Sequence, residues 1–179
     1  MDNGCTQKKW GIQVNTKRLA TMALLCAIAL TIFLAEAQIP MPITGVKPGL
    51  SNIVTLFTIA LLGKREAWLV LTARIVLGSV FAGSASSLIF SMTGGMCAYV
   101  IMSLTINIFP ENLLWAVSVF GAIAHNTGQL TAAALITRTP EIFIYWPVLL
   151  VSAIITGAFT GFAAQYLVKS GLFEKFDNN

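Results

Sequence analysis

Two polar groupings interrupt the apolar segments of this sequence and could do chemistry there. His125, Asn126 and Gln129 lie within the apolar segment 113–136, and Arg74 lies within another one. His125 and Gln129 are four residues apart, so a helix places them on one face with Asn126 beside it. Imidazole, amide and guanidinium groups in such segments are either satisfied by neighbouring helices or contact a ligand, and spacing alone leaves both open.

Arg74 is the most expensive of these groups to place in an apolar segment. It lies about two helical turns from the start of its segment, and a guanidinium near the centre of a membrane costs at least a few kcal/mol. We therefore expect it to face the interior of a bundle, with an anionic partner or carbonyl groups. The alternative is that its long stem reaches back to the membrane surface. Counting along the helices places Arg74 and His125 at comparable depths, which favours a shared cavity.

The stretch 36–52 separates the first two apolar segments and cannot be one helix. It holds three prolines and two glycines, which remove backbone donors and favour conformations that other residues avoid. Glu36, Lys47 and Asn52 stand in it. Polytopic membrane proteins build sites from polar groups at such helix interruptions. We predict that this stretch is a structured external loop that covers and walls a ligand cavity whose floor is formed by Arg74 and the His125–Gln129 face.

The composition indicates an integral membrane protein. Hydrophobic residues make up 56% and charged residues only 10% of the 179 positions, against about 25% charged in a soluble domain. With about 20 residues needed per span, five to seven spans fit. We predict an all-α protein with six spans, at about 17–35, 50–62, 66–82, 88–109, 113–136 and 142–168. The second gives only about 20 Å of helix, so the preceding loop either dips into the membrane or opens an outer vestibule.

The net charge of +4 is better explained by membrane orientation than by nucleic acid. Six spans and a cytoplasmic N-terminus place most cations inside and two, Lys47 and Arg138, outside, as cytoplasmic loops rich in Lys and Arg require. The inside cations are Lys8, Lys9, Lys17, Arg18, Lys64, Arg65, Lys169 and Lys175. We therefore predict a multi-pass protein of the cell membrane, with cytoplasmic tails at 1–16 and 169–179 and one transmembrane domain at 17–168. The cytoplasmic turn at 107–112 lacks a cation, and a cleavable signal peptide is the alternative for the first segment.

Two pairs of small residues occur at a spacing that lets helices approach closely. They are Ala23 with Ala27 in the first span and Gly157 with Gly161 in the last. Close packing of this kind is a main source of helix association in lipid. From spacing alone, the alanine face would most often pack against the protein's own helices.

Several short motifs together resemble a known family from about residue 17 to 168. They are Ala35-Glu36, Ile39-Pro40-x-Pro42, Gly45-x-Lys47-x-Gly49-Leu50-x-Asn52, Arg74 with Gly78, and Ala124-His125-Asn126-x-Gly128-Gln129. The family is named both "Gx transporter" and "heptaprenyl diphosphate synthase component I". It is similar to the S components of energy-coupling-factor transporters, six-helix proteins that capture a vitamin-like solute and dock on a T subunit driven by two ATPases. The resemblance implies that Ala23 and Ala27 dock on that T subunit and that the loop after the first helix acts as a lid.

Catalytic, metal and cofactor sites are not expected. Prenyl diphosphate synthases hold magnesium through aspartate-rich motifs, whereas the only aspartates here are Asp2 and Asp177. A lone histidine cannot supply paired haem or zinc ligands, and the three cysteines have no metal-ligand spacing. There is no G-x-x-x-x-G-K-[ST] phosphate loop, so any ATP would be hydrolysed by another subunit.

We therefore predict an S-component-like subunit for uptake of a small metabolite, either anionic or related to isoprenoids and quinones. Lys47 and Arg74 would compensate its negative charge, and Glu36 would pair with a cation or fix the loop. The groups predicted to supply hydrogen bonds are Asn52, His125, Asn126 and Gln129. One alternative is a non-catalytic accessory subunit of isoprenoid or quinone biosynthesis or of a membrane redox assembly. Another is a proton-coupled carrier that uses Glu36 and His125.

Overall fold

The computed structural model describes residues 16–39, 47–83 and 85–170. All regular elements within these ranges are helices. The two predicted tails lie almost entirely outside them, as does the middle of the predicted lid, residues 40–46. The helices are α1 (Thr16–Glu36), α2 (Asn52–Leu61), α3 (Lys64–Ala82), α4 (Ala85–Thr105), η1 (Glu111–Leu113), α5 (Leu114–Thr137), η2 (Pro140–Tyr145) and α6 (Trp146–Lys169), where η marks a 3₁₀ helix.

The six predicted segments are confirmed as helices, within four residues at either end. The largest differences are at the end of α4 and the start of α6. α4 stops at Thr105 because the chain turns before Pro110, and the residue ahead of a proline avoids helical geometry. α6 starts late because η2 precedes it and Pro147 occupies its first turn, where a missing N–H costs nothing.

Three helical stretches are long and apolar enough to cross a membrane: α1, α4 and the continuous stretch Pro140–Lys169. α2 is apolar but shorter. α3 begins with Lys64, Arg65 and Glu66 and contains Arg74, and α5 contains His125 and its polar neighbours, so neither has a uniformly apolar composition. Membrane association is thus supported by three helices, and a six-span topology stays a prediction.

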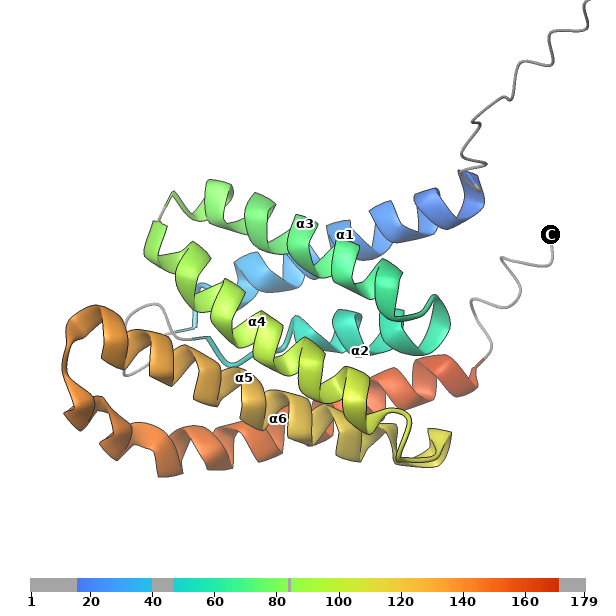
Figure 1. Cartoon of the computed structure of the whole chain (residues 1–179). Coiled ribbons are helices and arrows are strands. Elements are labelled where there is room, and N and C mark those ends of the chain that lie inside the picture. The colour runs from blue at the N-terminus through green and yellow to red at the C-terminus, as the bar shows by residue number, and fades with distance from the viewer. Residues whose placement is uncertain (1–15, 40–46, 84, 171–179) are drawn as a thin grey trace, which may run out of the picture.

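The short helix α2 lies at the centre of the bundle and packs against all five longer helices. The strongest pairings around it join α4 with α5, α5 with α6, and α1 with α3. Figure 1 shows the start of α1 and the end of α6 at the same end of the bundle. Near that end Arg18 of α1 and Glu66 of α3 approach to 3.7 Å between Nη1 and Oε1.

The alanine face of α1 does not pack inside the protein. Ala23 and Ala27 are exposed, and α1 buries a different stripe, Leu25, Ala29 and Phe33, against its neighbours. The expectation from spacing alone, that the alanines pack on the protein's own helices, is therefore wrong. The reason is that α1 is rotated so that Leu25 and Phe33 face the core, while Leu24 and Ile28 are exposed beside the alanines.

The glycine pair of α6 does form a packing face. A Cβ atom on Gly161 would lie 2.5 Å from the Cα atom of Trp115, and one on Gly157 would lie 2.7 Å from the Cα atom of Val119. Both contacts are with the backbone of α5, which cannot move aside as a flexible side chain can. The predicted close approach of α6 is confirmed, and α5 is its partner.

We expect Gly161→Leu to destabilise the protein because its side chain would force α5 and α6 apart. Overpacking of this kind costs about 1–3 kcal/mol or more, which a lowered thermal unfolding temperature in detergent will report. The matched control is Phe159→Leu, two positions earlier in α6, which is 70% exposed and should unfold as the wild type does. Equal unfolding temperatures for the two variants would contradict the close approach.

Candidate functional site

Polar side chains from four helices and the loop before α2 meet in the interior of the bundle. We call this set the polar cluster. Its members are all between 1% and 7% exposed, so the protein itself removes them from solvent. They are Glu36 of α1, Lys47 and Ser51 of the loop, Asn52 of α2, Arg74 of α3, and His125 and Gln129 of α5.

Glu36 ends α1 and holds the start of α2. One carboxylate oxygen accepts a hydrogen bond from the backbone N–H of Leu50, and the other accepts one from the N–H of Ser51 at 3.3 Å. The first N–H groups of a helix have no partner inside the helix, and a negative charge there is favourable. Within the described residues, no ion pair joins Glu36 to Lys47 or Arg74. Of its two predicted roles, the geometry is that of fixing the loop.

Lys47 joins the loop to α4 and α5. Its backbone N–H donates to Oε1 of Gln129 at 2.8 Å, and its ammonium donates to Oγ of Ser87 at 3.2 Å. The same ammonium lies 3.4 Å from the ring centroid of Phe33, a cation–π contact. Burial lowers the pKa of Lys47 to about 8, although the carboxylate of Glu36 acts in the opposite direction. Lys47 is thus a cation with little hydration.

Arg74 is only 2% exposed, so the alternative that it reaches the membrane surface is wrong. One guanidinium nitrogen donates to Oγ of Ser51, and the guanidinium carbon lies 5.9 Å from the Phe33 ring centroid. The partner is a neutral hydroxyl, not the expected anion or carbonyl. Phe33 therefore has a contact with each of the two buried cations.

The ring of His125 is enclosed by two glycines. Gly49 has a φ of +83°, which side-chain-bearing residues rarely adopt, and a Cβ there would lie 2.9 Å from Cδ2 of His125. A Cβ on Gly94 of α4 would lie 3.0 Å from Nδ1 of His125 and 2.6 Å from Cγ of Gln129. These glycines let the loop and α4 contact the polar face of α5 directly.

Several polar atoms of the cluster have no hydrogen-bond partner within the described residues. They are Nδ2 and Oδ1 of Asn52, Nε of Arg74, both ring nitrogens of His125 and Nε2 of Gln129. Buried polar groups in proteins are normally paired, and each unpaired one costs about 1–3 kcal/mol. The contacts of Gly49, Gly94 and Ser51 place these atoms around one region. The arrangement can therefore offer several hydrogen bonds and positive charge to a small molecule.

Asn126 has a contact on a different side of α5 from the polar cluster. Its Nδ2 donates to the carbonyl of Leu149 in α6 at 2.9 Å, so it joins α5 to α6. Its place one residue beyond His125 turns it about 100° around the helix, which is enough to face another neighbour. Its Oδ1 is buried and has no hydrogen-bond partner within the described residues, so the place of Asn126 in the ligand site stays a prediction.

Sequence reasoning missed Phe33, Ser51, Ser87 and Gly94. Single serines and phenylalanines are common in apolar helices, and a Gly-Gly pair at 94–95 indicates only tight packing. Of the four, Ser51 was the easiest to suspect from the sequence, because it lies between Leu50 and Asn52, two residues of the loop motif. None of the four could be assigned a contact before the fold placed α3 and α4 beside the loop.

Comparison with protein families gives one result across most of the chain. The family model described as "Heptaprenyl diphosphate synthase component I" matches residues 25–167. The chain belongs to this family. The matched range contains the whole polar cluster, so the cluster lies within the part of the chain that defines membership. No curated protein matches the chain, and no solved structure does.

We expect Glu36→Gln to destabilise the fold. A hydrogen bond to a charged group contributes about 1.5–3 kcal/mol, and the amide replaces one acceptor by a donor that faces the N–H groups of Leu50 and Ser51. Thermal unfolding in detergent measures the loss. Glu141→Gln in η2 is the control, since Glu141 is exposed and should tolerate the change. A variant at Glu36 as stable as that control would show that the carboxylate does not hold α2.

Proposed function

We propose that this protein is a non-catalytic membrane subunit that binds a small anionic molecule in the polar cluster and works with a partner protein. The observation that carries the proposal is the set of unpaired polar atoms around two buried cations. A purely structural polar core would satisfy these groups internally, because each unpaired one weakens the fold. A ligand that satisfies them repays that cost on binding.

The charge of the site favours an anion. Lys47 and Arg74 bring two positive charges, and the nearby acid, Glu36, already accepts two backbone N–H groups. Amide and imidazole groups from Asn52, His125 and Gln129 complete a set that can donate hydrogen bonds to carboxylate or phosphate oxygens. A cationic ligand would meet two like charges in the polar cluster, where the carboxylate of Glu36 already accepts two backbone N–H groups.

The family description supports an assembly concerned with prenyl diphosphates. It names a component of heptaprenyl diphosphate synthase, and a diphosphate or its precursor fits a dicationic site. The catalytic step would belong to another subunit, because the only aspartates in the sequence are Asp2 and Asp177 and magnesium–diphosphate needs several carboxylate oxygens. In this proposal, the subunit binds the anion at the membrane for its soluble or membrane partner.

A second candidate is uptake of the same anion, energised by separate T and ATPase subunits. The observation that favours it is the exposure of Ala23 and Ala27 on α1. Small exposed residues four apart allow another helix to approach closely in lipid. The loop from Glu36 to Asn52 would then serve as the outer lid over the ligand.

Both candidates place six helices across the cell membrane with both termini in the cytoplasm. The common end of α1 and α6 in Figure 1 fits an even number of crossings. Arg18, Lys64, Arg65 and Lys169 lie at the helix ends that this topology places in the cytoplasm. α3 and α5 can cross despite their polar residues, because Arg74 and His125 face the protein interior.

We expect Arg74→Met to fold but to lose its anion. Mass spectrometry of the small molecules that co-purify with the wild type identifies the anion, and thermal stabilisation by that compound measures its binding. The matched control is Arg65→Met on the same helix, where the side chain is exposed and should not matter. Wild-type stabilisation in Arg74→Met would remove Arg74 from the site. Absence of any anionic compound from the wild type, with no stabilisation by inorganic pyrophosphate, would count against the proposal itself.

Co-purification of partner proteins separates the two candidates. The test variant is Ala23→Leu with Ala27→Leu, and the control is Val76→Leu with Val80→Leu, an exposed pair with the same spacing on α3. Recovery of a prenyl synthase with all three proteins supports the accessory subunit. Recovery of a T subunit and ATPases that only the alanine variant loses supports uptake.

A further inference from the structure

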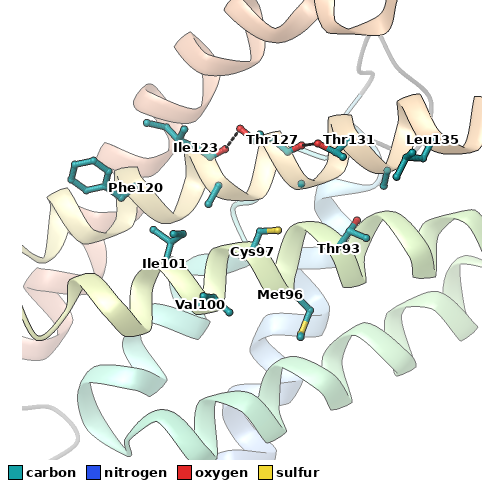
Figure 2. Close-up of a pocket in the computed structure, with 13 residues that line it drawn as sticks. Thr93, Met96, Cys97, Val100, Ile101, Phe120, Ile123, Thr127, Thr131 and Leu135 are labelled. Carbon is teal, nitrogen blue, oxygen red and sulfur yellow. Dashed lines mark hydrogen bonds between the residues drawn. The ribbon is translucent and has the colours of Figure 1, made fainter. Parts of the chain in front are cut away.

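A groove runs between α4 and α5 on the outside of the bundle, away from the polar cluster. It has a volume of about 730 Å³ and is lined on one side by Thr93 and Val100 and on the other by Thr127 and Leu135. Figure 2 shows the two rows of side chains facing each other along the helices. The volume lies in the range of roughly 300–1,000 Å³ that is typical of ligand pockets.

The groove offers almost no hydrogen bonds to an occupant. The hydroxyl of Thr93 donates to the carbonyl of Ile89 at 2.9 Å. The hydroxyls of Thr127 and Thr131 donate to carbonyls one turn earlier in α5, each at 2.8 Å. Threonine commonly satisfies its hydroxyl on its own helix in this way, so these O–H groups are not available as donors to an occupant. A hydrocarbon chain therefore fits the lining better than a polar solute.

The groove continues to a cation at the end of α5. A second pocket of about 370 Å³ shares Thr131 and Leu135 with the first and is also lined by Arg138 and Phe143. Arg138 follows the last residue of α5 and is exposed. The acid nearest to it in sequence is Glu141, and within the described part of the chain the two form no ion pair. The apolar groove thus ends at an exposed, positively charged side chain.

The surroundings indicate that the occupant comes from the bilayer. Residues on the groove walls are strongly exposed for apolar side chains, including Val100 at 46%, Phe120 at 46% and Leu135 at 75%. In a protein with membrane-crossing helices, such a surface faces hydrocarbon. We propose that the groove is a lipid site, in which one acyl chain of an anionic phospholipid lies between α4 and α5 and its phosphate contacts Arg138. The inference does not depend on what the polar cluster binds.

Native mass spectrometry of the full-length protein tests this. The protein is reconstituted in nanodiscs with equal amounts of phosphatidylglycerol and phosphatidylcholine and then released into detergent. We expect the wild type to retain one phosphatidylglycerol in preference. Arg138→Gln should reduce that preference about fivefold, which is what one basic residue near an anionic lipid surface contributes. Val100→Trp should abolish retention because the indole fills the groove.

Two controls match these variants. Lys169→Gln removes an exposed cation at the end of α6, and Leu104→Trp adds an indole at a position of α4 that is 60% exposed and does not line the groove. Both should retain lipid as the wild type does, and circular dichroism should show all variants to be helical. Equal retention of the two lipids by the wild type would overturn the proposal, as would phosphatidylglycerol binding unchanged by Arg138→Gln and Val100→Trp. Displacement of phosphatidylglycerol by an added prenyl phosphate would assign the groove to a different occupant and equally overturn it.

Discussion

The arrangement of the interior depends on the carboxylate of Glu36 at the start of α2. The serine that precedes this helix has helical backbone angles and makes no side-chain cap, and its hydroxyl accepts a hydrogen bond from Arg74. The N–H groups of Leu50 and Ser51 lie just before the helix, and the two carboxylate oxygens of Glu36 accept hydrogen bonds from them. Backbone N–H groups inside an apolar bundle cannot form hydrogen bonds with water. One charged side chain thus fixes the end of α1 to the start of α2 and helps to place the described loop residues 47–51 inside the bundle.

That placement explains how residues far apart in sequence form one cluster. With Leu50 and Ser51 fixed, Lys47 and Gly49 lie against Gln129 and His125 of α5. α2 has only 10 residues. The loop residues before it therefore occupy space inside the bundle that a longer helix would fill. Phe33 of α1 then contacts both Lys47 and Arg74, and its ring offsets part of the cost of burying two like charges. The cluster is accordingly built by helix ends and loop backbone as much as by the polar face of α5.

The sequence predicted the helices well and the site incompletely, and the difference has a physical reason. Apolar segments bounded by Pro, Gly and charged residues define helices locally, so α1, α3 and α5 were predicted within two residues of their bounds. The rotation of a helix about its axis depends on neighbours that the segment itself does not specify. For that reason Asn126 faces Leu149 and the alanines of α1 face outward. Likewise, the hydroxyl partner of Arg74 could not be foreseen, since Ser51 becomes its neighbour only through the loop.

α5 divides the molecule into chemically different regions, and its small residues make this possible. Its inner face carries His125 and Gln129, which contact Gly94 of α4, while its outer face carries the threonines of the groove. Gly128 lies between these faces, and a Cβ there would be 3.0 Å from both Sγ of Cys97 and the carbonyl oxygen of Thr93. This close approach sets the floor of the groove and also keeps α4 near enough for Gly94 to touch the polar cluster. The spacing of α4 and α5 is therefore a shared constraint on both regions, so a change that separates the two helices must alter the polar cluster and the groove together.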